Sequence, residues 1–197
     1  MRLRKKLLKF AIWFIVVGVF GLCSTYFYLK STWRDVLSEE ELDELVARIE
    51  FADDLPERFF ELYEEAYPGV MTTTLNKQMM KSVFSNDVIK SPSLLASTIS
   101  KLSRVDGDST RISRRKAYVL AWKLEEVADQ KQCLNWALKN YQFTPEFKGV
   151  DNIARYYYVK DLHSLNDEEL KSIITLMKKP SLVSIPKRGP LGTYITD

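Results

Sequence analysis

The sequence is poor in the residue types that build metal and redox chemistry. It holds two cysteines and one histidine in 197 residues. Cys23 lies in an apolar run and Cys133 in a predicted helix, so no disulfide framework is expected and the fold must rest on packing. His163 alone provides neither a His-based metal cluster nor a Ser/His catalytic pair. We therefore expect no metal centre, and we interpret His163 as structural or solvent-facing.

Acidic residues are absent from the start of the chain. Residues 1–30 hold six basic side chains and no acidic one: Arg2, Arg4, Lys5, Lys6, Lys9 and Lys30. The other 23 basic side chains are set against 26 acidic ones, so the net charge of +3 hides a formal charge of −3 beyond residue 30. Because the basic character belongs to the N-terminal segment, the composition argues against a nucleic-acid-binding protein.

Charge is absent altogether from Phe10 to Leu29, a run of twenty residues. At the rise of an α-helix this run spans about 30 Å, the hydrocarbon thickness of a bilayer. Basic residues precede it, Trp13 lies near one end, and Tyr26 and Tyr28 lie near the other. This pattern predicts a single membrane helix with a cytoplasmic N-terminus and an exported C-terminal part.

Two other targeting signals fit the same run less well. A cleaved signal peptide needs a shorter apolar core followed by an A-x-A-like site, and no such site follows. A lipoprotein signal would modify Cys23, but Leu22 is larger than the small residue that usually precedes the modified cysteine. The sequence therefore favours an uncleaved anchor.

The rest of the chain lacks internal repeats and any useful length of period-two alternation, which predicts a mainly α domain. Helix starts are indicated by capping boxes of Ser38 with Glu41 and of Asn166 with Glu169, and by Asp54 as an N-cap. The predicted helices cover residues 38–49, 54–67, 75–84, 91–103, 110–140 with a break near Asp129, 151–159 and 166–179.

The second half of the chain shows an ordered series of short motifs. In chain order they are Lys123-Leu124-Glu125 with Asn140; Gly149, Val150, Asp151 and Ala154; Tyr157, Tyr158 and Lys160; Leu165, Glu168, Glu169 and Leu170; and Pro180. The order resembles "K-L-E … I-L-E-x-Y-L-N", "G-I-E-A-A-A-x-x-Y-F-G-K", "L-T-x-A-E-A-A-x-L-A" and a "P-x-x-P" turn of the peptidoglycan glycosyltransferase domain, glycosyltransferase family fifty-one. Upstream, LPERFFELYEEAYPG and TTTLNKQMMKS are similar to its first two motifs, so the resemblance covers Leu55 to Lys187.

The resemblance implies a lysozyme-like helical domain, with lipid II as substrate and the outer face of a bacterial plasma membrane as location. It divides the chain into a cytoplasmic basic tail (1–9), a transmembrane helix (10–29), a juxtamembrane helix and linker (30–54), a glycosyltransferase-like domain (55–190) and a C-terminal tail (191–197). No cofactor is expected, although a divalent cation could accompany catalysis if the chain is active.

The family's catalytic base is the Glu of its first motif. Counting back from Gly69 without a gap puts Phe60 at that position, and a one-residue deletion brings Glu61 there instead. Glu64 and Glu65 are the alternates. A carboxylate is needed to take the proton from the acceptor hydroxyl. Three acidic residues on one helix are also typical of a solvated face, so both interpretations stay open.

At other reactive positions, this sequence departs further from the family's motifs. Counting back from Glu125 puts Ala117 where the second catalytic Glu should be, and the Glu of the "I-L-E-x-Y-L-N" helix falls on Trp136. The Gly-Gly of the second motif falls on Met71 and Thr72, whose side chains would crowd a backbone meant to approach a substrate. These departures indicate a retained fold that has lost its chemistry.

Substrate-binding side chains are predicted on two segments. They are Thr74, Gln78 and Lys81 in the second motif, and Arg114, Arg115 and Lys116 in a basic cluster that also includes Arg104 and Arg111. Such groups suit a diphosphate or anionic lipid headgroups. A solvated helix face near an anionic membrane is the alternative.

Three hypotheses follow. The first is a pseudoenzyme that binds lipid-linked precursor, or a cell-wall synthesis partner, without catalysis. The second is a divergent but active glycosyltransferase that uses Glu61 or a neighbour. The third is a helical adaptor subunit of a membrane complex whose likeness to the family is accidental.

Overall fold

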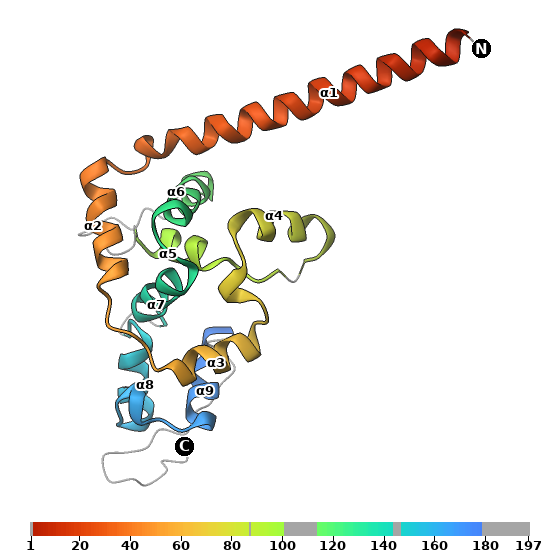
Figure 1. Cartoon of the computed structure of the whole chain (residues 1–197). Helices are drawn as coiled ribbons and strands as arrows, with labels where there is room; N and C mark the ends of the chain where they lie inside the picture. The colour runs from red at the N-terminus through yellow and green to blue at the C-terminus, as the bar shows by residue number, and fades with distance from the viewer. Residues whose placement is uncertain (1, 87, 101–113, 144–146, 179–197) are drawn as a thin grey trace.

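The computed structural model describes residues 2–86, 88–100, 114–143 and 147–178 (Figure 1). Its helices are α1 (Arg2–Ser31), α2 (Glu39–Glu50), α3 (Glu57–Ala66), α4 (Leu75–Phe84), α5 (Pro92–Ser100), α6 (Arg114–Val127), α7 (Gln130–Asn140), α8 (Val150–Tyr158) and α9 (Asp167–Lys178), with short 3-10 turns η1 (Thr32–Asp35), η2 (Val70–Thr72) and η3 (Leu162–Ser164). Within the described residues, one isolated bridge of Gln142 with Lys148 is the only extended pairing. The predicted mainly α fold is confirmed.

Helix α1 projects from the domain as one continuous helix of 30 residues (Figure 1). The stretch Lys9–Asp35 is long and apolar enough to cross a membrane, and no residue of its most apolar 18-residue window is buried in the domain. Since an unpartnered apolar helix of this length is unfavourable in water, a bilayer is the environment that suits it.

The last turns of α1 dock on the domain through aromatic and polar contacts. The ring of Tyr26 packs edge-on against Trp122 of α6, with centroids 5.1 Å apart. Asn76 of α4 bridges the two, because it donates to the Tyr26 hydroxyl over 3.2 Å and accepts from the Trp122 indole over 2.8 Å. Lys30 pairs with Glu126 at 2.7 Å. The anchor is thereby tied to both α4 and α6.

Two helices begin with the predicted capping boxes. At the start of α2, Glu41 N–H donates to the Ser38 hydroxyl and Ser38 N–H to the Glu41 carboxylate. At the start of α9, the backbone N–H of Glu169 donates to the Asn166 side chain over 3.0 Å, and the Asn166 N–H donates back over 2.9 Å. Each box satisfies two backbone donors that the first helical turn leaves free.

The predicted N-cap at Asp54 is wrong. Helix α3 begins at Glu57, after Pro56, and has no side-chain cap. The segment before α3 is bound to α7 instead, because Leu55 N–H donates to the buried side chain of Asn135 over 3.0 Å. Asn135 also donates to the Asp53 carbonyl over 3.1 Å. This contact with α7 holds residues 52–55 outside the helix, which begins only at Glu57.

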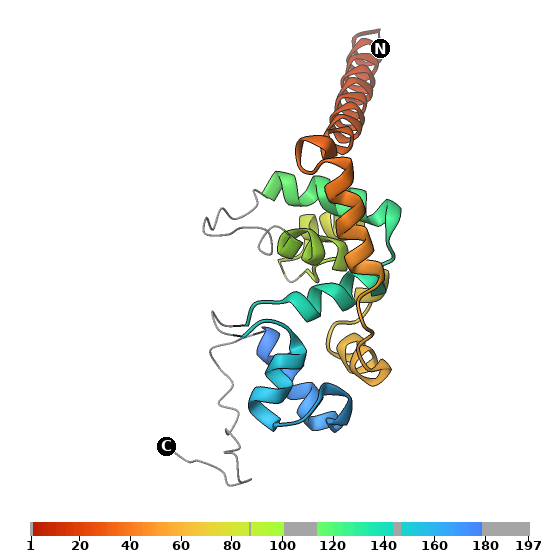
Figure 2. The same ribbon diagram turned by 90° about the vertical axis from the view of Figure 1, so that its left-hand side faces the viewer.

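Helix α7 is the central element of the domain (Figures 1 and 2). Every residue from Cys133 to Leu138 is buried. On one side α7 packs with α3, α8 and α9, and on the other with α2, α5 and α6, so it belongs to two apolar clusters. Burial raises the pKa of the Cys133 thiol to about 12, as expected for a packed cysteine.

Helices α3 and α9 are joined at their surface by Arg58. Its guanidinium forms a two-pronged ion pair with Asp167 and a second ion pair with Glu61 at 2.6 Å. The hydrogen bond from Arg58 holds the pKa of the Asp167 carboxyl below its ordinary value. Because these groups are exposed, the ion pairs of Arg58 orient α3 on α9 but add little to the free energy of unfolding.

Candidate functional site

A cavity of about 440 Å³ opens at the C-terminal end of α3. Its described lining comes from four parts of the chain: Tyr63, Ala66, Tyr67 and Pro68; Val88, Ile89, Lys90 and Leu95; Tyr141; and Met177. The volume falls in the range of small-molecule sites. No carboxylate is among these described lining residues, and Lys90 is the one charged side chain among them.

One face of α3 supplies the aromatic wall. Tyr63, Ala66 and Tyr67 are spaced three and four residues apart, so their side chains lie on the same side of the helix. The rings of Tyr63 and Tyr67 are 4.7 Å apart. Burial raises the pKa of both hydroxyls, with the neighbouring Tyr141 adding to the effect, so both stay protonated near neutral pH.

Glu61 and Glu65 lie on the other face of α3. Each is two residues from Tyr63, a spacing that points a helical side chain away from it. Glu61 is held by Arg58, and Glu65 pairs with Lys171 of α9 at 3.3 Å. The structure therefore places the predicted base, Glu61, and its alternate, Glu65, in surface ion pairs outside the lining of the cavity.

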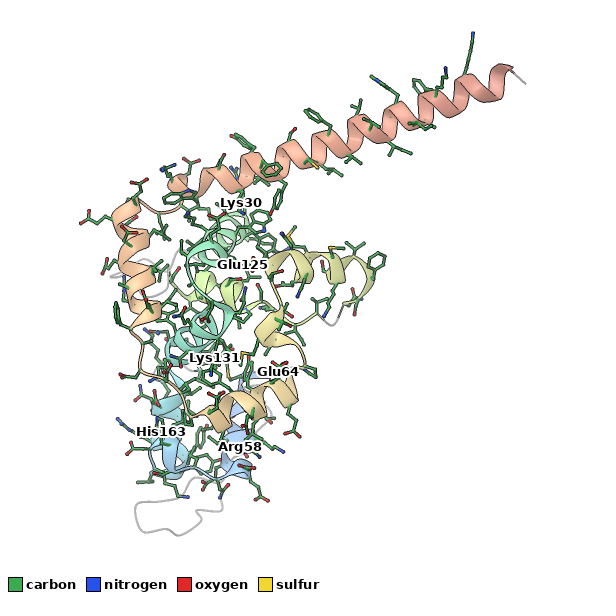
Figure 3. The ribbon with its side chains drawn as sticks, viewed as in Figure 1. Lys30, Arg58, Glu64, Glu125, Lys131 and His163 are labelled. Carbon is green, nitrogen blue, oxygen red and sulfur yellow. The ribbon has the colours of Figure 1, made fainter. Side chains whose placement is uncertain are left out.

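Glu64, on the C-terminal half of α3, is engaged with the backbone of the following turn (Figure 3). Its carboxylate accepts from Gly69 N–H over 2.6 Å and from Met71 N–H over 3.3 Å. These amides belong to the start of η2, where helical donors have no partner of their own. Glu64 thus shapes the turn in which Gly69 adopts a φ of 82°.

Glu125 of the K-L-E motif is half-buried where α4, α5 and α7 meet α6 (Figure 3). One carboxylate oxygen accepts from Leu75 N–H over 2.6 Å, from the Ser93 hydroxyl over 2.8 Å and from the Gln130 side chain over 3.1 Å. Through these partners it fastens the first turns of α4, α5 and α7 to α6. The matched motif therefore has a structural role in this chain.

The predicted substrate-binding residues of the second motif belong to α4. Thr74 is its N-cap, accepting from Lys77 N–H, and Gln78 accepts from the backbone N–H of Ser91 over 2.8 Å. Lys81 is exposed on the same helix. Gln78 thereby positions the segment that contributes Lys90 to the cavity. Whether these residues touch a ligand stays a prediction.

The predicted basic cluster lies at the other end of the domain. Arg114, Arg115 and Lys116 are exposed in the first turn of α6, the helix that docks against α1, whereas α3 packs on α9 (Figure 2). The fold does not bring them together with Glu61. Arg104 and Arg111 lie outside the described residues. His163 is exposed in η3, as predicted, and no metal-binding group of three or more acidic, His or Cys side chains occurs in the described part of the chain.

The positions that an ungapped count along the motifs assigns to the family's carboxylates are packed in the apolar core. Phe60 is buried among the residues around α3, Trp136 among those around α2, and Ala117 beside Leu75 and Trp122. None of these three environments could accept an ionised carboxylate without loss of solvation.

Replacing Ala117 by glutamate, which restores the family's residue type, is expected to lower the free energy of unfolding by about 3 kcal/mol, because a carboxylate would be buried without a partner. Thermal unfolding of the full chain in detergent measures the effect. Ala47→Glu on the exposed face of α2 is the matched control and should change little. Equal stability of both variants would contradict the buried environment of Ala117.

The structure is a helical domain with a cavity at the end of α3, carried on an N-terminal apolar helix. The model of the transglycosylase family matches residues 53–191, so the chain belongs to that family and the likeness is not accidental. Membership implies a lipid-linked cell-wall precursor as the substrate class. No curated protein matches the chain.

The sequence pointed to only part of the cavity. Tyr63 and Tyr67 both lie in the segment LPERFFELYEEAYPG of the first motif, and their spacing of four residues could have indicated a shared aromatic face. Tyr141 and Met177 carry no such signal, because they reach the cavity only through the packing of α7 and α9 beside α3. The sequence instead predicted the acidic residues of α3 as the site, and their side chains lie outside the cavity lining.

Proposed function

We propose that this protein is a membrane-anchored member of the transglycosylase family that binds a lipid-linked cell-wall precursor in the cavity at the end of α3 without polymerising it. The observation that carries the proposal is the lining of that cavity. It combines three tyrosines with one lysine and includes no carboxylate among its described residues.

Binding is supported by the chemistry of the lining. Tyrosine rings offer flat apolar faces for sugar rings together with a hydroxyl for hydrogen bonding. Lys90 supplies a cation suited to a diphosphate. Apolar side chains such as Ile89 and Met177 complete the wall. A glycolipid diphosphate presents all of these features in one molecule.

Loss of catalysis is supported by the positions of the carboxylates. Glycosyl transfer of this kind needs a base within hydrogen-bonding reach of the acceptor hydroxyl. Glu61 and Glu65 lie on the opposite face of α3 in ion pairs, and Glu64 is held by two backbone amides. Each would have to abandon these partners before it could act.

The location supports the same function. The basic residues before the apolar run favour a cytoplasmic N-terminus, which puts the domain on the outer face of a bacterial plasma membrane. The lipid-linked precursor is embedded in that membrane by its lipid. Docking of Tyr26 and Lys30 on the domain keeps the cavity at a fixed distance from the bilayer.

Binding is tested with the full chain in lipid nanodiscs by titration with the lipid-linked disaccharide precursor. Tyr67→Ala should weaken binding about tenfold, since an aromatic contact is worth about 1 kcal/mol beyond its buried area. Tyr156→Ala, which removes an aromatic ring of α8 outside the cavity lining, is the matched control and should bind like the unchanged chain. Equal affinity of all three proteins would refute the cavity as the binding site.

A further inference from the structure

The cavity at the end of α3 is bordered by the last turn of α9. Met177 of α9 lines the cavity, and the helix ends one residue later, at Lys178. Residues 179–197 come next in the sequence and lie outside the described residues. The chain therefore enters this segment at the rim of the cavity, so the segment is tethered beside the site.

Pro180 fixes the point at which the helical path stops. A proline ring clashes with the carbonyl group four residues earlier in a helix, and the residue before a proline disfavours the helical backbone. Lys179 is that preceding residue, so α9 cannot continue past the cavity. The chain must change direction between Met177 and Pro180.

An uncharged stretch follows the proline. Residues 181–186 read SLVSIP and hold three large apolar side chains, those of Leu182, Val183 and Ile185. When extended, the five residues from Met177 to Leu182 span up to about 17 Å. The stretch is therefore long enough to fold back over the cavity beside which it begins.

The cavity offers apolar surface that this stretch can cover. Five lining side chains are half-buried, because each packs against the core and also borders the cavity: Tyr67, Ile89, Leu95, Tyr141 and Met177. Covering them with apolar side chains removes surface from water on both partners, which is favourable. A cavity of about 440 Å³ can admit part of a peptide as well as a small ligand.

Charge selects the uncharged stretch over its neighbours in the sequence. Lys90 is the one charged side chain among the described lining residues. It repels Lys179 on one side of the stretch and the pair Lys187-Arg188 on the other, so these cations stay outside the cavity. Residues 181–186 are thus the part of the segment that fits the lining.

We propose that residues 181–186 of the same chain occupy the cavity when no ligand is bound, and that a ligand enters only when they leave. Tethering at Lys178 gives the stretch a local concentration far above that of a free peptide. The loop that has to close is short, so its entropic cost is small. For the identity of the displacing ligand the inference rests on the proposed function, whereas occupation of the cavity by the chain does not.

Occupation is tested by cross-linking the full chain in nanodiscs without precursor, in a Cys23→Ala background. The pair Ala66→Cys and Leu182→Cys joins the cavity lining to the stretch through a short bismaleimide, and the product is quantified by peptide mass spectrometry. Ala47→Cys with Leu182→Cys is the matched control, because Ala47 is likewise an exposed helical alanine. The buried thiol of Cys133 remains in place.

The yield of cross-link within one chain should be several-fold higher for position 66 than for position 47, and saturating precursor should lower it. Equal yields at the two positions would overturn the proposal. Cross-links that join two chains instead of one would identify a second copy as the source of the occupant, and would overturn it as well.

Competition is tested by titrating the precursor into the full chain in nanodiscs. Leu182→Ser combined with Ile185→Ser should bind it several-fold more tightly than the unchanged chain, because the apolar competitor is lost. Leu191→Ser with Ile195→Ser is the matched control and should bind like the unchanged chain. Equal affinity of the two double variants would overturn the proposal. Precursor binding by none of these proteins would refute the proposed function alone, since the cross-linking yields without precursor decide where the stretch lies.

Discussion

Replacing Gly149 by alanine is expected to lower the free energy of unfolding by about 3 kcal/mol or more. Gly149 precedes α8 with a φ of 83°, and a Cβ atom there would lie 2.3 Å from the carbonyl oxygen of Lys139. Because the obstacle is backbone, the end of α7 must move. Gly149 N–H also donates to the Tyr141 carbonyl over 2.8 Å, so the displacement reaches the cavity.

Gly69→Ala separates this steric effect from conformational strain. Gly69 has nearly the same φ, 82°, but a Cβ there meets its nearest neighbour, the Thr72 hydroxyl, only at 4.0 Å. This substitution should lower the free energy of unfolding by about 1 kcal/mol, because only the left-handed backbone is unfavourable for alanine. Thermal unfolding of the two variants in the same detergent gives the comparison. Equal losses at both positions would contradict the close approach of Gly149 to α7.

Replacing Glu125 by alanine is expected to destabilise the chain by about 3 to 5 kcal/mol, since it leaves several donors without their acceptor. These donors are the Leu75 amide, the Ser93 hydroxyl and the Gln130 side chain. For a chain of this size, a loss in that range lowers the melting temperature by roughly 10 °C. Alanine favours helix, so the loss cannot come from α6 itself.

The adjacent Glu126→Ala provides the control. Glu126 is exposed, and its pKa is lowered by the hydrogen bond from Lys30 and by Lys123. Pairs of this kind contribute little in water, so its removal should cost less than about 1 kcal/mol. A Glu126 variant that melts below the Glu125 variant would contradict the assignment of Glu125 as the node that joins the helices.

The helices were predictable because their starts are local. Ser38 with Glu41 and Asn166 with Glu169 satisfy the first turn from within four residues, which a sequence displays directly. The break near Asp129 was found, although its capping box with Gln132 was missed. Asp54 failed as a cap because Asn135, eighty residues away in sequence from Leu55, competes for the same segment.

The candidate site was less predictable because it is assembled by packing. The acidic residues of α3 matched a family motif in type, but the helical repeat directs Glu61 and Glu65 away from Tyr63 and Tyr67. The motif carried no information on which face of α3 would be covered. That face is set by α9, whose Met177 closes the cavity from the far end of the chain.

The central claim is that the chain binds its precursor and leaves it unchanged. The most direct test incubates the full chain in nanodiscs with radiolabelled lipid-linked disaccharide precursor and separates the products by size. The cavity lining predicts that the label is recovered as intact precursor at every time point. Glycan strands made by the unchanged chain and lost in Glu61→Gln would contradict the account and establish an active glycosyltransferase.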